Sequence, residues 1–228
     1  MCENGALIEA EDLHKRFGGS VALDGLSVRV RGGEVVAVLG PSGSGKSTLL
    51  LCLAGIISPD EGDVRYRGRS LRSLPDAART RLRRDEFGFV FQFGQLVPEL
   101  TALDNVSLPL RLAGLRRRDA YARARGWLER LGVDDVADKR AGEMSGGQSQ
   151  RVAVARALVT GPRAVFADEP TGSLDSLNGE MVMELLVSAG RDHGTTVILV
   201  THEPIVAAYA EREIVIRDGK LAQVSVTA

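Results

Sequence analysis

One nine-residue segment, residues 40–48, constrains the fold of this chain more than any other feature. It reads GPSGSGKST, follows the apolar run VVAVL and leads into the helical pattern STLLLCLAG. This is the pattern G-x-x-x-x-G-K-[ST] in its strand–loop–helix context. Backbone N–H groups of such a loop point inward, and the helix start adds the positive end of its dipole. The segment therefore predicts an α/β protein that holds nucleotide phosphates, the alternative being a glycine-rich turn that matches by chance.

The polar residues of this loop have expected roles. Lys46 supplies a mobile positive charge for the β- and γ-phosphates, and the Ser47 hydroxyl is placed to bind Mg²⁺. The loop does not specify a task, because kinases, GTPases and many motors share it. The residues expected to surround the phosphates are Gly40, Pro41, Ser42, Gly43, Ser44, Gly45, Lys46, Ser47 and Thr48.

Short continuous apolar runs indicate how the rest of the core is built. Runs this short, rich in Val, Ile and Phe, are typical of strands buried on both faces, as in a parallel sheet. Helical patterns alternate with them, which favours an α/β core with a mainly parallel sheet. The predicted strands are residues 35–39, 87–91, 164–167 and 196–200, and the helical patterns include 46–54, 148–160 and 179–189.

Two regions depart from this alternation. Residues 7–31 and 62–69 read as short strands with turns and suit a small antiparallel β-lobe. Residues 101–143 read as mostly helical, with arginines between apolar residues. We interpret them as an inserted helical subdomain with a solvated basic face, and contact with lipid headgroups is the alternative. We expect a single domain over residues 1–228.

Composition and charge exclude several classes of protein. Of 228 residues, 44% are hydrophobic and 26% charged, as in ordinary globular proteins. The net charge of −1 argues against a nucleic-acid partner held through its phosphates. No apolar run approaches the ~20 residues of a membrane span, and the N-terminus lacks the order of a signal peptide. Cys2 and Cys52 have no metal-ligand spacing, and we expect Cys52 to be buried, which fits a reducing cytoplasm.

A pair of carboxylates follows the third predicted strand, where residues 164–169 read AVFADE. At the carboxyl end of a strand they would face the crevice where α/β sheets bind ligands. Asp168 is the natural partner of Mg²⁺, and Glu169 is suited to orient and deprotonate an attacking water. A solvated strand end is the alternative, which the upstream phosphate loop disfavours.

A second glycine-rich helix start lies at residues 145–151, which read SGGQSQR before VAVARALV. Its backbone N–H groups are suited to phosphate oxygens, although it has no lysine. Two anion-accepting helix starts in one chain require an explanation.

Together these motifs resemble the ATP-binding subunits of ATP-binding cassette (ABC) transporters over nearly the whole chain. In that family SGGQ is the signature motif, and here it stands in MSGGQSQR. Met144 replaces the usual Leu and Ser149 the usual Gln, Lys or Arg. Met is similar in volume to Leu and should pack in its place.

The resemblance assigns further residues by their order along the chain, since each alone would be an ordinary structural residue. Gln92, after FGFVF, matches the Q-loop glutamine, and Asp175 matches the D-loop aspartate that contacts the other subunit. His202 matches the switch histidine at the γ-phosphate, and Phe17 the aromatic residue that stacks on adenine. The resemblance thus implies catalytic roles for Glu169, His202, Gln92 and Lys46, metal ligands at Ser47, Gln92 and Asp168, and nucleotide contacts at Ser145, Gly146, Gly147, Gln148 and Asp175.

The resemblance also implies how the protein works. ATP and Mg²⁺ bound to one subunit would be covered by residues 145–148 of a second, in a head-to-tail dimer that is most simply a homodimer. A membrane-spanning permease on a separate polypeptide would hold this chain at the cytoplasmic face of the membrane. Phe93, Leu96 and Val97 are the expected docking groove, with ordinary packing as the alternative.

Within the family, VFQFGQLVPELTALDNVSLPL and PTGSLDS are most similar to the macrolide-exporter and lipoprotein-releasing branch. That branch implies efflux, lipoprotein release or mechanical transmission. The alternatives are an importer, such as one for polar amino acids, and a soluble ABC ATPase outside transport. A ribosomal type would normally carry two cassettes, and a chromosome type a long coiled coil for which residues 101–143 are too short.

Overall fold

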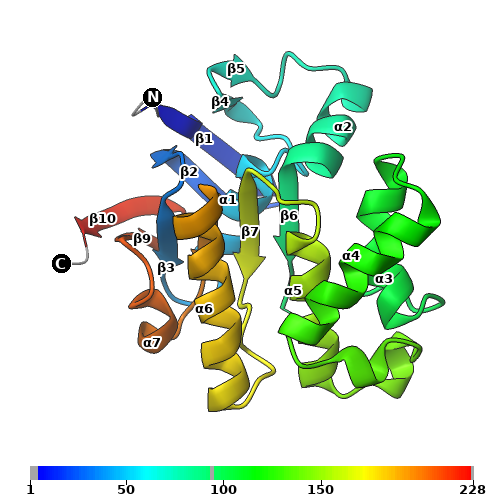
Figure 1. Ribbon diagram of the computed structural model, residues 1–228. Coiled ribbons are helices and arrows are strands. Elements are labelled where there is room, and N and C mark those ends of the chain that lie inside the picture. The colour runs from blue at the N-terminus through cyan, green and yellow to red at the C-terminus, as the bar shows by residue number, and fades with distance from the viewer. Residues whose placement is uncertain (1–4, 93–94, 227–228) are drawn as a thin grey trace.

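A six-stranded, mainly parallel sheet forms the centre of the protein in a computed structural model, which describes residues 5–92 and 95–226 (Figure 1). Neighbouring strands run parallel except at one edge, where β10 pairs antiparallel with β9. The four apolar runs of the sequence form β3, β6, β7 and β8, which confirms the predicted core. In sheet order the strands are β10 (Lys220–Val226), β9 (Arg212–Arg217), β3 (Val35–Leu39), β8 (Thr196–Val200), β7 (Ala164–Asp168) and β6 (Phe87–Val90).

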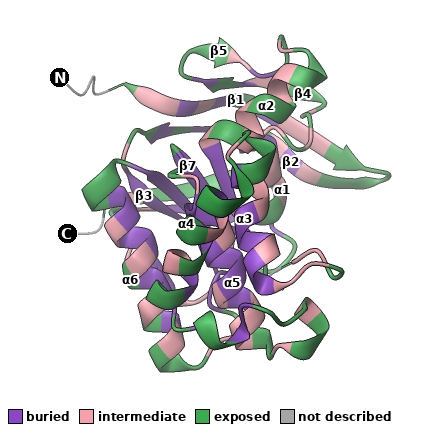
Figure 2. Ribbon diagram, turned by 45° about the vertical axis from the view of Figure 1, so that its right-hand side comes forward, coloured by how far each residue is buried: buried purple, intermediate pink, exposed green. Residues whose placement is uncertain are grey.

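Helices bury one face of this sheet. Successive side chains of a strand alternate between faces, so Val35 and Ala37 pack with these helices while Val36 and Val38 pack on the other side. Figure 2 shows the buried residues gathered on the central strands and on the helix sides turned towards them. The helices on this face are α3 (Ala102–Leu112), α4 (Arg117–Arg130), α5 (Gly146–Leu158) and α6 (Ser176–His193).

The opposite face carries α1 (Lys46–Leu53) and a four-stranded antiparallel sheet, which confirms the predicted β-lobe. Arg212 on β9 links the two sheets. Its Nε lies 2.6 Å from Glu34 Oε1 in a nearly buried ion pair. The same guanidinium donates to the Arg29 carbonyl on β2. In sheet order the antiparallel strands are β2 (Ser20–Arg31), β1 (Ala6–Phe17), β4 (Glu61–Tyr66) and β5 (Arg69–Ser70).

One helix was not anticipated from the sequence. Helix α2 (Asp76–Glu86) follows the antiparallel sheet, and none of its residues is fully buried. It therefore lacks the apolar face of helical period by which a helix is recognised. Its Arg83 donates to the Gly55 carbonyl at 2.8 Å and so ties the helix to the end of α1.

Residues 101–143 are mostly helical, as predicted. Thr101 caps α3 by accepting the Asp104 N–H at 3.1 Å. Two arginines of the basic face stack on aromatic rings, with the Arg117 guanidinium 4.9 Å from the centre of the Tyr121 ring and that of Arg130 5.1 Å from Trp127. Two short 3₁₀ helices, Asp134–Val136 and Ala141–Glu143, connect α4 to α5, and a four-residue helix α7, Pro204–Ala207, follows β8.

Cys52 is buried within the core, as expected, and burial raises the pKa of its thiol to about 12. Cys2 lies outside the described residues. In the part of the chain that the structure covers, no helix combines the length and the apolar character needed to cross a membrane.

Candidate active site

The carboxyl ends of four neighbouring strands meet at one edge of the central sheet. Asp168 at the end of β7 pairs with Val200 at the end of β8, and Val200 pairs in turn with Val38 near the end of β3. On the other side of β7, Val90 pairs with Ala167. This register brings to one edge the predicted catalytic residues that follow these strands, namely Lys46 after β3, Gln92 after β6, Glu169 after β7 and His202 after β8.

The phosphate loop is a tight backbone curl that requires glycine at two positions. Gly45 has a φ of 103°, and a Cβ there would lie 2.2 Å from the Ala22 carbonyl oxygen. Gly40 has a φ of 151°, and a Cβ there would lie 2.2 Å from the Ile216 carbonyl oxygen. Any side chain would therefore both strain the backbone and overlap a neighbouring strand or turn.

Lys46 begins α1 and reaches back over the loop. Its ammonium donates to the carbonyls of Gly40 and Pro41, both at 2.9 Å. An ammonium has three donors, so one remains for a phosphate oxygen. Only 9% of the residue is exposed, which increases the effect of its charge on anything bound in the loop.

Ser47 and Asp168 form the oxygen-rich part of the site. Burial raises the pKa of the Asp168 carboxyl, and a hydrogen bond from the Ser47 hydroxyl opposes that shift. Mg²⁺ takes oxygen ligands, usually one or two from protein together with water and phosphate oxygens. These two residues fit that pattern. Among the described residues, no group of three or more His, Cys, Asp or Glu is placed to hold a metal ion.

Glu169 occupies a strained conformation directly after β7. Its φ is 47°, a left-handed value that costs a residue with a side chain roughly 1–2 kcal/mol. Its N–H donates to the Val200 carbonyl at 2.8 Å, and the Thr201 hydroxyl donates to its Oε2 at 3.1 Å. These bonds from β8 and the residue after it hold the carboxylate in one orientation.

His202 completes this arrangement. Its Nδ1 lies 2.7 Å from Glu169 Oε1, and Nδ1 must donate because a carboxylate only accepts. The hydrogen bond to Glu169, with the charge of that carboxylate, raises the pKa of the His202 imidazole above its ordinary value. Because 66% of the side chain is exposed, the ring stays accessible to a ligand.

Thr201 belongs to the same network and was missed in the sequence. It is fully buried, donates to Glu169, and accepts the Glu203 N–H at 3.1 Å. The sequence feature that could have identified Thr201 is its position directly between a buried strand and the candidate histidine.

Phe17 lies at the tip of the β1–β2 hairpin, where 53% of it is exposed. The Lys15 ammonium is 5.6 Å from the centre of its ring. The same hairpin packs against the phosphate loop, since Gly45 touches Ala22 on β2. The ring is thus an exposed aromatic surface on the hairpin that borders the loop.

Ser145 caps the second glycine-rich helix start. Its hydroxyl accepts the Gln148 N–H at 3.2 Å, and Gln148 Oε1 accepts the Ser145 N–H at 3.0 Å. This capping box uses the N–H groups of Ser145 and Gln148 but not those of Gly146 and Gly147. The two glycine N–H groups are therefore the ones that the box leaves for an anion.

Asp175 caps α6, because its Oδ1 accepts the Asn178 N–H at 2.9 Å. Hydrogen bonds from Asn178 lower the pKa of the Asp175 carboxyl. The preceding turn lies against the signature segment, since a Cβ on Gly147 would be 3.4 Å from Leu174 Cδ2. The signature and D-loop segments thus lie next to each other.

The signature helix and the phosphate loop belong to different parts of the sheet. Helix α5 packs on the edge strand β6, where a Cβ on Gly88 would lie 2.4 Å from the Ala157 carbonyl oxygen. The phosphate loop follows β3, which is three strand spacings, roughly 14 Å, from β6. The two anion-accepting helix starts are therefore set apart along the sheet.

Two of the expected docking residues contact the helical segment. Leu96 packs against the helical core, and Val97 is bound through its N–H and carbonyl by the buried Asn105 amide, at 2.8 and 3.1 Å. Phe93 lies outside the described residues. Leu96 and Val97 thus have partners within the chain, and the groove expected at these residues stays a prediction.

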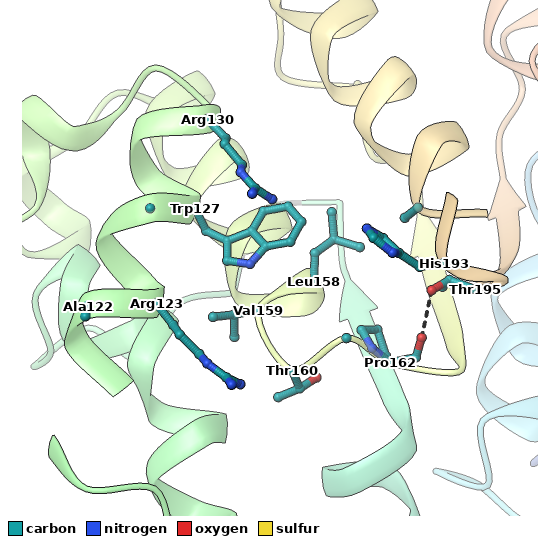
Figure 3. Close-up of a pocket in the computed structure, with 13 residues that line it drawn as sticks. Ala122, Arg123, Trp127, Arg130, Leu158, Val159, Thr160, Pro162, His193 and Thr195 are labelled. Atoms are coloured by element: carbon teal, nitrogen blue, oxygen red, sulfur yellow. Dashed lines mark hydrogen bonds between the residues drawn. The ribbon is translucent and has the colours of Figure 1, made fainter. Parts of the chain in front are cut away.

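Hollows also lie elsewhere on the described surface, and two of them bear on function. One, about 450 Å³, runs along the edge strand β6, and its lining includes Phe89, Phe91, Leu112 and Arg83. The other, about 440 Å³, lies at the opposite end of the sheet from the phosphate loop, near the starts of β7 and β8, where Trp127, Arg130 and His193 face it (Figure 3). No predicted nucleotide-binding residue lines this second cavity.

Known proteins resemble this chain in sequence and in structure. Residues 23–172 match the family described as ABC transporter. The macrolide export ATP-binding/permease protein MacB of Marinobacter nauticus is 45% identical over 95% of this chain and 34% of that protein. MacB of Salmonella paratyphi A is 49% identical over 87% of this chain and 31% of that protein. The chain thus spans about a third of the length of these relatives.

A solved structure resembles the whole fold. The ATP-binding cassette MJ0796, in a dimeric post-hydrolysis state bound to ADP and Pi, superposes with a TM-score of 0.93. It is 37% identical, and the match covers 97% of this chain and 99% of that one.

The contact between Glu169 and His202 gives a testable change in titration. Glu169→Gln removes the negative charge that favours protonated His202, so we expect the pKa of His202 to fall towards its ordinary value. NMR titration of the imidazole signals measures this shift. His14, which pairs with Asp12 and Asp24, and His193 serve as internal controls. An unchanged His202 titration would contradict the contact.

Proposed function

The chain belongs to the ABC transporter family and has the fold of its ATPase cassettes, and from that premise we propose that it drives an exporter by hydrolysing ATP in a pocket shared by two cassettes. One observation carries the proposal. The Glu169 carboxylate, fixed by His202 and Thr201, lies at the strand edge that also bears the phosphate loop. A base aligned with a phosphate cradle is what phosphoryl transfer to water requires.

ATP binding falls to the residues that follow β3 and to the hairpin beside them. The Lys46 ammonium and the loop N–H groups bind the β- and γ-phosphates, and Phe17 stacks on adenine. Ser47 and Asp168, with Gln92, would hold Mg²⁺, which when bound offsets negative charge on the phosphate oxygens. The hydrogen bond between Ser47 and Asp168 supports this assignment, because it places two oxygen ligands together.

Hydrolysis depends on the pair formed by Glu169 and His202. Glu169 takes a proton from the attacking water as general base. His202 binds Glu169 through Nδ1, which leaves Nε2 to contact an oxygen of the γ-phosphate. One ring thereby aligns the base with the phosphate, and the contribution is mainly one of orientation.

A second cassette supplies the remaining contacts. Residues 145–148 of one subunit would cover the γ-phosphate held by the other, and a two-fold dimer forms two such pockets from one self-complementary face. The lateral separation of α5 from the phosphate loop supports this arrangement. So does the dimeric structure of MJ0796. The simplest assembly is a homodimer.

Export is the task that the relatives favour. Both MacB proteins are described as macrolide export ATP-binding/permease proteins. We propose that the membrane-spanning part here is a permease on a separate polypeptide, through which this chain is held at the cytoplasmic face of the membrane. Efflux, lipoprotein release or mechanical transmission are the tasks that the resemblance to this branch implies.

The groove along β6 is the proposed docking site for that permease. Its lining combines aromatic rings of Phe89 and Phe91 with Leu112, which is 60% exposed, and with the guanidinium groups of Arg83 and Arg84. A short amphipathic helix with acidic residues at its rim would fit this lining. Because Phe91 directly precedes Gln92, movement of such a helix would reach the nucleotide edge.

The role of Glu169 is tested by Glu169→Gln, which keeps the shape of the side chain but removes the base. We expect kcat for ATP to fall at least about a hundredfold, ATP binding to persist and an ATP-bound dimer to accumulate. Steady-state ATPase assays, calorimetry and size-exclusion chromatography with MgATP measure these three effects. Glu184→Gln on the exposed side of α6 is the matched control. Near-wild-type turnover of Glu169→Gln would refute the proposal.

The docking groove is tested by Leu112→Glu, which places a charge among its aromatic rings. We expect recovery of the permease from solubilised host membranes to be lost, while the ATPase activity of the isolated chain stays at the wild-type level. Val226→Glu is the control, because Val226 is 74% exposed on β10 at the opposite edge of the sheet. Undiminished recovery with Leu112→Glu would exclude the groove, and recovery of an importer permease would exclude export.

A further inference from the structure

Gln150 is a fully buried side chain on α5 that joins three segments of the chain. Its Nε2 donates to the Pro170 carbonyl at 2.9 Å and to the Phe91 carbonyl at 3.3 Å. Pro170 lies after β7 and Phe91 after β6. One side-chain amide on the signature helix therefore binds the backbone that leaves two neighbouring strands.

The two acceptors fix the orientation of this amide. Carbonyl oxygens only accept, so the NH₂ group must face them, and the reversed amide would place Oε1 against two oxygens. In the described part of the chain, the buried Oε1 of Gln150 has no hydrogen-bond partner. A buried oxygen without a donor destabilises the fold.

Gln150 is also a polar residue on an otherwise apolar, buried face of α5. It is in phase with Ala153, Val154, Ala157 and Leu158, at positions i+3, i+4, i+7 and i+8, and all four are buried and apolar. Packing alone would favour an apolar residue at position 150. Apolar packing does not account for the glutamine, whereas its two hydrogen bonds do.

Each carbonyl that Gln150 binds is adjacent to a residue of the proposed active site. Phe91 precedes Gln92, and Pro170 follows Glu169, whose left-handed φ of 47° needs support from its surroundings. Helix α5 itself begins at the signature segment. We propose that Gln150 is a positioning residue, which fixes Gln92 and Glu169 relative to the signature helix.

This inference rests on the proposed function, because it concerns where the base of ATP hydrolysis is held. Gln150 is on α5, whereas the phosphate loop follows β3, three strand positions from the strand that α5 covers. Loss of its hydrogen bonds should therefore affect the chemical step and leave nucleotide binding unchanged.

Gln150→Met tests the role, since it removes both donors and nearly keeps the volume. We expect kcat for ATP to fall at least about tenfold, because small displacements of catalytic groups are costly. KM for ATP should stay at the wild-type value. Steady-state kinetics of the full chain with MgATP give both constants, and thermal unfolding gives the stability of the same samples.

Thr195→Val is the matched control for loss of a buried hydrogen bond. The Thr195 hydroxyl donates to the Pro162 carbonyl at 2.8 Å, at the opposite end of the sheet (Figure 3). We expect this variant to lose thermal stability and to keep kcat. Wild-type kcat in Gln150→Met, or an equal loss of kcat in Thr195→Val, would overturn the positioning role.

A second pair of variants keeps the test decisive if Gln150→Met does not fold. Gln150→Asn and Gln150→Leu are similar in size, but only Asn retains an amide donor. A purely structural role predicts that Leu, which suits the apolar face, is at least as active. The positioning role predicts the opposite order, in which Gln150→Asn is less stable than Gln150→Leu but has the higher kcat. A kcat of Gln150→Leu equal to or above that of Gln150→Asn would overturn the positioning role.

Wild-type protein and Glu169→Gln are measured in the same series. A wild-type chain without ATP turnover would overturn the proposed function and this inference with it. Turnover by the wild type that depends on Glu169 but not on Gln150 would overturn this inference alone.

Discussion

The parallel register of β3, β8, β7 and β6 is the constraint on which the site depends, since it aligns the ends of strands that are far apart in the sequence. The register is fixed because both faces of the sheet are buried, with Val197 and Leu199 in one core and Ile198 and Val200 in the other. A slip of one residue would exchange these two sets. It would also turn Thr201 and His202 away from Glu169. The alignment of Glu169 and His202 is thus a consequence of how the core packs.

One residue with a strained backbone lies where this alignment matters. Glu169 has a left-handed backbone, and its hydrogen bonds to the Val200 carbonyl and from Thr201 and His202 hold it against the neighbouring strand and the loop after it. Gln150 adds support from the helix side through Pro170. The proposed base, Glu169, is therefore supported by both a strand and a helix. Because α5 begins at the signature segment, the proposed contact with a second cassette at that segment would act on a helix already bonded to the backbone beside Glu169.

The sequence predicted the elements whose signals are local. Strands buried on both faces appear as apolar runs, and the phosphate loop has its own pattern of glycines and lysine, so these features and their common edge could be predicted. Helix α2 could not, because it has no apolar face. Thr201 and Gln150 were missed because their partners lie 20 or more residues away. The sequence does contain one indication of Gln150, because it is a polar residue at a position of α5 that shares a face with apolar residues. The groove expected at Phe93, Leu96 and Val97 stays a prediction, although Leu96 packs against the helical core.

The central claim is that each chain holds only half of a hydrolytic pocket, and mixing two inactive variants tests it most directly. Lys46→Ala disables the phosphate loop, and Ser145→Arg blocks the signature segment. In a mixed dimer, the intact loop of one chain meets the intact signature of the other. With random exchange and independent sites, the mixture should regain about a quarter of the wild-type ATPase rate, because half of the dimers hold one complete pocket. A mixture no more active than the sum of its two components would contradict the claim.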